Sequence, residues 1–472
     1  MKTFVLSILL ALSIPCQAKD YWVRADGTAT KANAIGPDSL KSKTMSMATF
    51  NQSSFSAGDR VYISASGGKY TTGLCNNAGG SCGVANNALS SGNGGSPFQV
   101  IGVPDSLGKR PLIDGAALST PQIAIGVGAD YITVSGIDVL GSTITPVRSV
   151  FVDNHAGRSG FGVYLKDIKI LSNNRNNISG DHDCFVVSDT AGSDSQVWLD
   201  NVSAAHCLAY SGEGVANSNQ AFTAHEKDKL KVTNSTATDV NQCVGTVTSS
   251  QFTATGLVCD QILYTAMSTG SQPVQASQSC DNCRFNFNST YAGGSGNPTI
   301  FGDSTNTGLA TDSIVTVTNS IISIGPTYPV GGPSGTVYAY LGGTVNFSGN
   351  KWFINSPKFS LWTFASSASP TVWNMTGDQL IFNAAIATGT DQVFASNTGA
   401  VLNWNGNTFT FNPTNNLKSV DLLYTFAGGT LNSSSNIFNN CGNLHNSPTT
   451  PIQVLTNGGN AGTVNSAGDA CQ

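Results

Sequence analysis

The chain is poor in the groups that acid–base chemistry and electrostatic binding use most. Only 10% of its 472 residues are charged, and it has five histidines. Glu213 and Glu226 are its only glutamates. Acids outnumber bases, which argues against a general attraction to nucleic acid or to anionic lipid. Beyond the first 18 residues, no apolar run is long enough to predict a membrane span. If the ligand is acidic, the cations that hold it must be local.

The first 18 residues have the pattern of a secretory signal. Lys2 precedes an apolar run from Phe4 to Ile14, and Ala18 supplies a small residue at the expected cleavage point. A lipoprotein that begins at Cys16 is the alternative, which Pro15 disfavours. Cleavage leaves 21 basic and 27 acidic groups, a net charge of −6. We therefore expect an exported protein, extracellular or periplasmic.

The cysteine count indicates an oxidising compartment, because cleavage leaves ten cysteines, an even number. We expect local disulfides, since a zinc site at Cys280-x-x-Cys283 would lack a second pair at the required spacing. The expected pairs are Cys75 with Cys82, Cys280 with Cys283, and Cys441 with Cys471, and a bridge between Cys184 and Cys243 is a further possibility.

Helical periodicity is almost absent, whereas glycine, with 52 copies, is abundant. This composition predicts a nearly all-β chain. The exception is Asp38 to Phe50, where the apolar spacing allows a short helix before a strand at Arg60 to Ile63.

An internal repeat predicts the architecture. A short strand, a polar turn with Gly, Asn or Asp, and a second strand recur at steps of 28 to 35 residues, with one step of 20. A period near 30 without helices predicts a coil of about three strands per turn whose apolar side chains stack inside. The copies are Val134–Val139, Leu165–Ile170, Leu199–Ala204, Val232–Ala237, a degenerate Phe252–Leu257, Phe287–Ala292, Val317–Ile322, Phe347–Trp352, Met375–Leu380, Trp404–Phe409 and Ser433–Phe438. A repetitive β-sandwich array is the structural alternative.

With this repeat, the chain resembles secreted right-handed parallel β-helix proteins of the pectin-lyase superfold, including polysaccharide lyases. Tyr21–Gly27, Ala57–Ile63 and Arg110–Gly115 are similar to the opening of such lyases. The resemblance implies a single right-handed parallel β-helix of about 10–12 coils, with carbohydrate as the ligand class. The expected divisions are a signal at 1–18, an N-terminal cap at 19–59, the β-helix at 60–440 and a C-terminal cap at 441–472.

Family motifs do not identify the reaction. Val197–Asn201 is similar to a Val-Trp-Ile-Asp-His strand of pectate lyases, but Asn201 stands in place of the histidine and no Arg-x-Pro-x-x-Arg follows. Gly180–Asp183 is similar to the paired aspartates of polygalacturonases, whose accompanying Gly-His-Gly and Arg-Ile-Lys elements are missing. No catalytic residue is therefore transferred from a family.

The titratable groups gather in one stretch, residues 148–231. It holds 18 charged residues in 84 positions, whereas residues 285–472 hold nine in 188. Four of the five histidines lie there as well. This distribution favours a scaffold with one polar site over a merely hydrated face.

The alignment of two strands predicts how this site is built. Asp183–Asp189 aligns with Gln220–Glu226 one coil later, which places Phe185 beside Phe222. Aligned residues of a parallel ladder lie about 4.8 Å apart, so Asp189 and Glu226 would stack and either share a cation or raise one pKa. Ca²⁺ is the expected cation.

These considerations assign roles to eleven residues. The predicted catalytic residues are His225, Lys227, Glu226 and Asp183. The predicted substrate-binding residues are Arg148, Arg158, His155 and His182. The predicted metal ligands are Asp189, Asp181 and Asp228. His206 is interpreted as structural, because it follows an inward alanine and adjoins Cys207.

The sequence favours a lyase that cleaves an acidic, uronate-containing polysaccharide by β-elimination. A glycoside hydrolase with paired carboxylates and a non-catalytic adhesin or tail-spike-like binder are the alternatives. The expected partner is a polysaccharide, with neither nucleic acid nor a membrane span. Monomer and trimer stay open, as do the identity of the sugar and its linkage.

Overall fold

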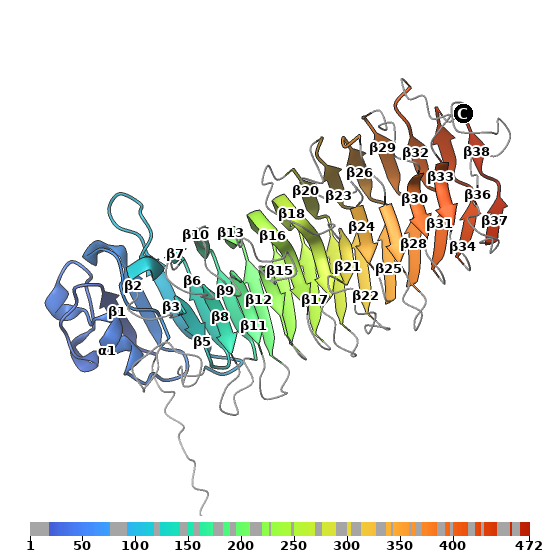
Figure 1. The fold of residues 1–472 in the computed structure, drawn as a ribbon. Helices are drawn as coiled ribbons and strands as arrows, with labels where there is room; N and C mark the ends of the chain where they lie inside the picture. The colour runs from blue at the N-terminus through green and yellow to red at the C-terminus, as the bar shows by residue number, and fades with distance from the viewer. Residues whose placement is uncertain are drawn as a thin grey trace, which may run out of the picture.

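The fold is an elongated stack of parallel strands. Colours run in order along the stack from the N-terminal to the C-terminal end (Figure 1). All pairings between named strands are parallel in the part of the chain that is described, which confirms the predicted all-β parallel β-helix. The computed structural model describes residues 18–75, 92–117, 123–141, 149–153, 161–172, 183–188, 195–207, 220–225, 228–246, 250–269, 276–288, 300–303, 313–326, 337–340, 343–357, 361–364, 371–384, 392–396, 400–413, 421–425, 429–440, 454–455 and 463–472.

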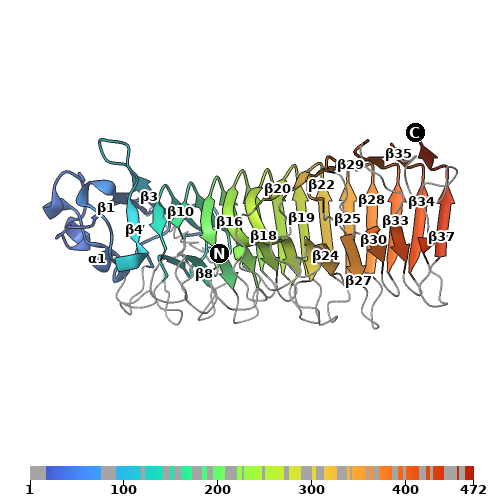
Figure 2. The ribbon, with the colours of Figure 1, turned by 45° about the horizontal axis from the view of Figure 1, so that its top comes forward.

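The first strand of each coil belongs to one sheet of 15 strands, which lie side by side along the molecule (Figure 2). In order these strands are β1 (Asp20–Arg24), β2 (Arg60–Ser64), β3 (Phe98–Val103), β6 (Ile132–Ser135), β9 (Val163–Lys166), β12 (Gln196–Asp200), β15 (Lys229–Thr233), β17 (Gln251–Thr255), β19 (Ser277–Asp281), β22 (Ile314–Thr318), β25 (Gly343–Ser348), β28 (Thr371–Thr376), β31 (Val401–Asn405), β34 (Thr430–Ser434) and β37 (Thr463–Ala467). The sheet thus includes β1 and β37, which lie in the stretches expected to form the caps.

The second and third strands form the remaining walls. One sheet has 18 strands: β4 (Leu112–Asp114), β5 (Ile125–Val127), β7 (Asp138–Leu140), β8 (Val150–Asp153), β10 (Lys169–Ser172), β11 (Phe185–Ser188), β13 (Ser203–Cys207), β14 (Gln220–Ala224), β16 (Thr236–Thr246), β18 (Val258–Thr269), β20 (Arg284–Phe287), β21 (Phe301–Asp303), β23 (Ile321–Ile324), β26 (Lys351–Ile354), β29 (Gln379–Phe382), β32 (Thr408–Thr410), β35 (Ile437–Asn439) and β38 (Ala470–Cys471). A sheet of five follows: β24 (Val337–Tyr340), β27 (Leu361–Phe364), β30 (Gln392–Ser396), β33 (Asp421–Thr425) and β36 (Val454–Leu455).

Helices are short and lie near the N-terminus. The helix expected over Asp38–Phe50 is reduced to α1 (Met47–Asn51), where the Ser46 hydroxyl accepts a hydrogen bond from the Thr49 N–H at 3.1 Å. The expected helix is shorter because Met45 pairs with Val23 as a β-bridge. The single-turn 3₁₀ helices are η1 (Lys31–Asn33), η2 (Lys41–Lys43), η3 (Ala65–Gly67) and η4 (Gly115–Ala117). Among the described residues, no helix has the length and apolar character that a membrane crossing requires.

The first and second strands of each coil meet at a turn that contains one left-handed residue. Asp167 and Asn201 hold this position in two successive coils. Glycine, asparagine and aspartate suit it because they adopt positive φ at low cost. The column, with φ between 50° and 74°, comprises Gly136, Asp167, Asn201, Asn234, Gly256, Asn282, Asn319, Gly349, Gly377, Gly406, Ser435 and Gly468.

Two members of this column give a matched test of backbone strain. A Cβ added to Gly406 would meet nothing within 4 Å, so Gly406→Ala is expected to lose about 1 kcal/mol of unfolding free energy through the positive φ alone. Ser435 already bears that strain at φ 56°, so Ser435→Gly is expected to gain a similar amount. Urea unfolding of both variants checks the signs. Equal stability of Gly406→Ala and the parent would contradict the strain.

Inward side chains form one continuous core. Phe185 and Phe222 are buried and stack with ring centroids 5.6 Å apart. The ladder that begins at Val134 continues through Leu165, Leu199 and Val232 as predicted. In the later coils it connects Val317, Phe347, Met375, Trp404 and Ser433, again as predicted.

Two predicted copies of the repeat are wrong in register. Val232 pairs with Ala254 rather than Phe252, and Ala254 pairs with Cys280, so the next copy is Cys280–Phe285 and not Phe287–Ala292. Small inward residues at these two rungs removed the apolar signal that marks the other copies. The steps from Val232 are therefore 22, 26 and 37 residues.

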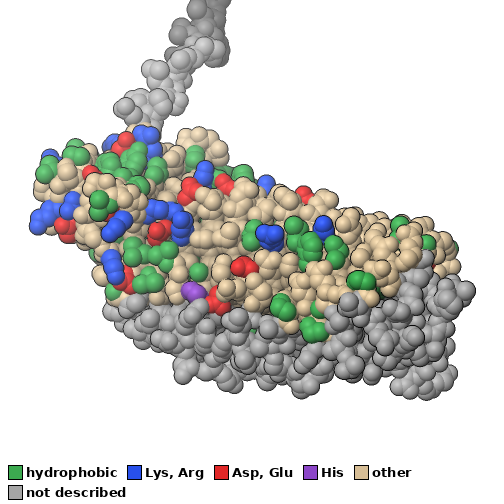
Figure 3. All heavy atoms as spheres, turned by 90° about the horizontal axis from the view of Figure 1, so that it is seen from above, with side chains coloured by type: hydrophobic (Ala, Val, Ile, Leu, Met, Phe, Trp, Pro, Cys, Tyr) green, Lys and Arg blue, Asp and Glu red, His purple; other side chains and the backbone are tan. Residues whose placement is uncertain are grey.

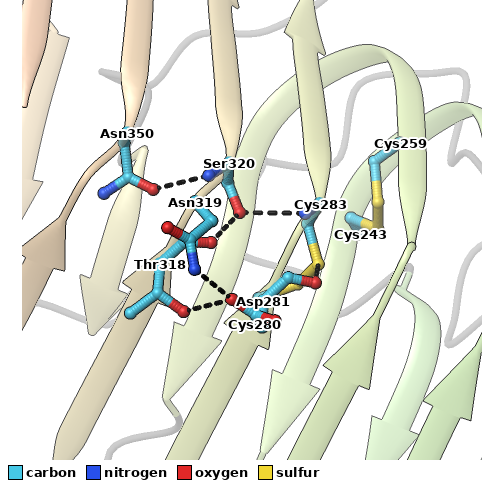
Figure 4. Close-up of a disulfide and its surroundings, with 9 residues drawn as sticks. All are labelled: Cys243, Cys259, Cys280, Asp281, Cys283, Thr318, Asn319, Ser320 and Asn350. Carbon is cyan, nitrogen blue, oxygen red and sulfur yellow. Dashed lines mark hydrogen bonds between the residues drawn. A yellow bond between two sulfur atoms is a disulfide. The ribbon is translucent and has the colours of Figure 1, made fainter.

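The disulfides confirm one predicted pair and replace another. Cys280 and Cys283 are bonded across the turn between β19 and β20, beside the Cys243–Cys259 bridge (Figure 4). The considered Cys184–Cys243 bridge is wrong, because Cys184 joins Cys207 at the end of β13 and Cys243 joins Cys259 in the next coil. Cys75 is disulfide-bonded, but Cys82 and Cys441 lie outside the described residues, so the pairings predicted for them stay predictions.

In the C-terminal half, the residue after the left-handed turn residue is polar, and it is buried in every coil except the last, where Asp469 is half-buried. The side-chain oxygen of each one accepts a hydrogen bond from the backbone N–H of its counterpart one coil earlier, at 2.8–2.9 Å. The first of these bonds joins the Cys283 N–H to Ser320 (Figure 4). We call this column the inner ladder; its members are Ser320, Asn350, Asp378, Asn407, Asn436 and Asp469. It ties successive coils together through groups that would otherwise be costly to bury.

Candidate active site beside the third strands

The register of the third strands is the framework of the candidate site. Phe185 pairs with Phe222 and Val187 with Ala224, which confirms the predicted alignment of β11 with β14. In the coil before, β8 pairs with β11, with Ser188 beside Asp153. The predicted site residues lie in the sequence just before or just after these strands.

Most of the predicted site residues lie outside the described residues, in the connections around these strands. Their roles therefore stay predictions, including the stacking of Asp189 on Glu226. They are Arg148, His155, Arg158, Asp181, His182, Asp189, Glu226 and Lys227.

Asp183 and Asp228 are described, and both carboxylates anchor the backbone. Asp183 is 2% exposed, and its Oδ1 accepts a hydrogen bond from the Gln220 N–H at 2.8 Å. Asp228 is fully buried, and its Oδ1 accepts from the Ser195 N–H at 3.3 Å. Each bond joins neighbouring coils, so these contacts support structural roles for a predicted catalytic acid and a predicted metal ligand.

Metal binding rests on residues that are not described. No group of three His, Cys, Asp or Glu side chains within the described segments is arranged as a ligand set. Asp228 directs one carboxylate oxygen to a backbone N–H, while its predicted partners Asp181 and Asp189 lie outside those segments. The predicted Ca²⁺ site therefore stays a prediction.

His225, a predicted base, lies directly after β14. Its backbone N–H donates to the Val187 carbonyl at 3.0 Å, which fixes its main chain to the preceding coil. Its side chain is half-buried. The position fits the predicted site, because Glu226 and Lys227 follow at once in the sequence.

His206 and Asp239 form a pair that the sequence interpretation missed. His206 Nδ1 lies 2.6 Å from Asp239 Oδ2, and the side chains are 30% and 8% exposed, respectively. Both residues have positive φ, 59° and 58°, and they face each other because Ala205 pairs with Thr238 and Cys207 with Val240. The Cys184–Cys207 disulfide holds the neighbouring residue. A buried carboxylate thus orients a partly exposed imidazole.

A sequence signal for this pair was available. His206 and Asp239 are 33 residues apart, the same step that separates Leu199 from Val232 in the repeat. Residues one step apart lie side by side in adjacent coils, so the pair follows from the period.

On the face in Figure 3, lysine and arginine side chains gather over the N-terminal and central coils, whereas the described surface at the C-terminal end is largely uncharged.

Comparison with known proteins assigns the chain to no family. No family model matches it, and neither does any curated protein. A solved structure of a GH136 lacto-N-biosidase from Eubacterium ramulus is similar, with TM-score 0.39 and 9% identity over 96% of this chain and 68% of that one. A rhamnogalacturonan lyase is also similar, with TM-score 0.29 and 11% identity over 95% of this chain and 87% of that one. The function is therefore argued from this chain's own residues.

Proposed function

We propose that the protein is an exported carbohydrate-active enzyme that cleaves an acidic polysaccharide by β-elimination. The observation that carries this proposal is the His206–Asp239 pair, 2.6 Å apart at the corner between the second and third strands. A carboxylate that accepts the Nδ1 proton fixes the imidazole tautomer and leaves Nε2 basic. Such an arrangement is suited to proton abstraction near neutral pH.

In this reaction His206 Nε2 takes the proton from C5 of a uronate residue. The C4–O4 bond breaks, a C4–C5 double bond forms, and the departing oxygen takes a proton from water. The abstraction is favourable only if a positive group neutralises the substrate carboxylate. Arg148, Arg158, Lys227 and a Ca²⁺ ion are the candidates from the sequence for that role. His225, which directly follows the neighbouring third strand β14, is the second candidate base.

The predicted export and the disulfides both fit an extracellular enzyme, because disulfides form in oxidising compartments. Three disulfides join described cysteines, as an oxidising compartment favours, and the N-terminal signal pattern predicts secretion. A polymer too large to enter a cell is a fitting substrate for such a protein.

The assay that tests the proposal separates the three classes of function. β-Elimination creates an unsaturated uronate that absorbs at about 235 nm, whereas hydrolysis releases reducing ends without that absorbance. We expect the purified protein to raise absorbance on at least one of alginate, pectate and a glucuronate-containing polymer. Reducing ends alone would make the protein a hydrolase. Binding without any cleavage would make it an adhesin or tail-spike-like binder.

A further inference from the structure

A second candidate surface lies on a different wall of the stack, on the outer face of the 15-stranded sheet. There the strands β9, β12, β15 and β17 line an open depression of about 400 Å³. Its principal side chains are Tyr164, Trp198, Lys229 and Lys231, which we call the aromatic–lysine groove. They lie in coils 33 or 34 residues apart and therefore side by side.

Trp198 is unusual because a tryptophan is held in place yet left exposed. Its neighbours Val197 and Leu199 point into the core, whereas Trp198 is 41% exposed. The indole Nε1–H donates to the Thr233 hydroxyl at 2.9 Å, and the Tyr164 ring lies 4.9 Å away, centroid to centroid. A rigid exposed aromatic surface loses little conformational entropy when a ligand stacks on it.

The charges around the two rings are arranged asymmetrically. Lys231 Nζ lies 4.5 Å from the centroid of the Trp198 ring, and Lys229 lines the same depression. The nearby acid, Asp200, accepts hydrogen bonds from Thr233 at 2.8 Å, Tyr164 at 3.0 Å and Asn234 at 3.3 Å. Three donors thus engage its charge, whereas Lys231 lies over the Trp198 ring and Lys229 lines the depression. A net-negative protein therefore presents a local positive surface here.

The hydrogen-bond network also fixes the Tyr164 side chain. Burial and the hydrogen bond to Asp200 raise the pKa of Tyr164 to about 12, so its hydroxyl stays protonated and donates to Asp200. Burial works against ionisation of Asp200, but its hydrogen bonds from Thr233, Tyr164 and Asn234 outweigh it and lower its pKa. Tyr164 therefore stays neutral and Asp200 stays ionised across the neutral range.

We propose that the aromatic–lysine groove binds anionic pyranose units of a polysaccharide. The apolar face of a sugar ring packs against the exposed part of Trp198 beside Tyr164, while Lys229 and Lys231 pair with the anionic substituents. A carboxylate and a sulfate ester share the chemistry that two ammonium groups recognise. The groove lies on the first strands, whereas His206 ends a second strand, so the groove anchors the polymer outside the catalytic corner. Binding here does not depend on turnover.

Affinity electrophoresis and calorimetry with four polymers test this site: pectate, alginate, a sulfated galactan and neutral dextran. The parent is expected to bind an acidic polymer and to leave dextran unbound. Trp198→Ala is expected to weaken binding roughly 10- to 30-fold, as for loss of a central aromatic anchor. The Lys229→Ala/Lys231→Ala double variant is expected to lose most of the salt dependence of binding. Comparing the affinity for pectate and alginate with the affinity for the sulfated polymer shows whether the groove recognises a carboxylate or a sulfate ester.

Lys351→Ala supplies the matched control. Lys351 Nζ also lies over an aromatic ring, 5.2 Å from Phe353, but on a second strand far along the chain. Its removal is expected to leave binding unchanged. Parent-like affinity in both groove variants would overturn the inference, as would equal binding of dextran or no binding of any acidic polymer by the parent. A parent that binds but does not cleave would leave this site standing and reject the proposed lyase.

Discussion

Replacing His206 by alanine is expected to reduce turnover on the acidic polymer by about 10²–10⁴-fold, the usual contribution of a placed general base. The imidazole is partly exposed and is oriented by Asp239, so its removal takes away a proton acceptor while the core stays intact. The initial rate of the absorbance increase measures the loss. Far-UV circular dichroism is expected to match that of the parent.

Asp239→Asn tests whether the carboxylate acts through the imidazole. The amide can still accept the Nδ1–H bond but carries no charge, so kcat is expected to fall with little change in KM. A parent-like kcat in Asp239→Asn would reduce Asp239 to a structural residue.

His225→Ala and Lys227→Ala complete this comparison, since both were predicted as bases from the sequence. If either abolishes turnover while His206→Ala retains it, the catalytic base is one of the two residues predicted from the sequence. Replacement of Lys418 or Asp421 in the charge-poor coils is expected to do little and serves as the control.

Replacing Asp378 by asparagine is expected to remove a pH-dependent loss of stability. Burial raises the pKa of this inner-ladder carboxyl to about 6, although hydrogen bonds from Asn350 and Trp352 work against the shift. The folded protein therefore binds the proton more tightly than the unfolded chain, whose carboxyl has a pKa of 3.8. Stability contributed by the neutral form is lost as pH rises through this window, by about 2–3 kcal/mol between pH 4 and pH 8.

Asparagine fits this rung because its neighbours already show the contacts. Asn407 Nδ2 donates to the Met375 carbonyl at 3.0 Å, and Asn436 Nδ2 donates to the Trp404 carbonyl at 3.2 Å. The cost lies elsewhere, since Asp378 Oδ2 accepts the Trp352 indole N–H at 3.1 Å and an amide nitrogen cannot. A lost acceptor costs about 1–3 kcal/mol, so the change in pH slope is the informative readout.

Chemical unfolding at a series of pH values measures that slope. Asp281→Asn is the control, because hydrogen bonds from Thr318 and Asn319 lower the pKa of Asp281 and place its titration below this window. Its slope from pH 4 to pH 8 is expected to match that of the parent. A parent-like slope in Asp378→Asn would show that this carboxyl is not the source.

The period and the inward pattern were sufficient to predict the stack, because they report the core directly. Phe185 and Phe222 were aligned correctly since each alternates with outward residues and belongs to the same rung. Ala254 and Cys280 were missed because a small inward residue leaves no apolar mark. Where the core signal is weak, the register is decided by the neighbouring coils and not by the strand itself.

The candidate sites were harder to predict, because they depend on side chains brought together across coils. His206 and Asp239 meet only once the period is applied to polar residues as well as apolar ones. Trp198 lies between two inward residues, so its exposure follows from the register, but its contacts with Tyr164 and Lys231 need two further coils. Asp183 was predicted as catalytic and Asp228 as a metal ligand because both lie in the charged stretch. In the structure both are buried, and each carboxylate accepts a hydrogen bond from a backbone N–H.

Because the left-handed turn residue recurs once per coil, the molecule can change in length by whole coils. From Phe347 onward the same inward position recurs at Met375, Trp404 and Ser433, at intervals of 28 or 29 residues. Each such interval adds one strand spacing, about 4.8 Å, to the long axis. Insertion or deletion of a whole interval keeps every turn residue and every ladder partner in phase. Evolution and design can therefore change the reach of this protein one coil at a time, without disturbing the distant corner where His206 and Asp239 meet.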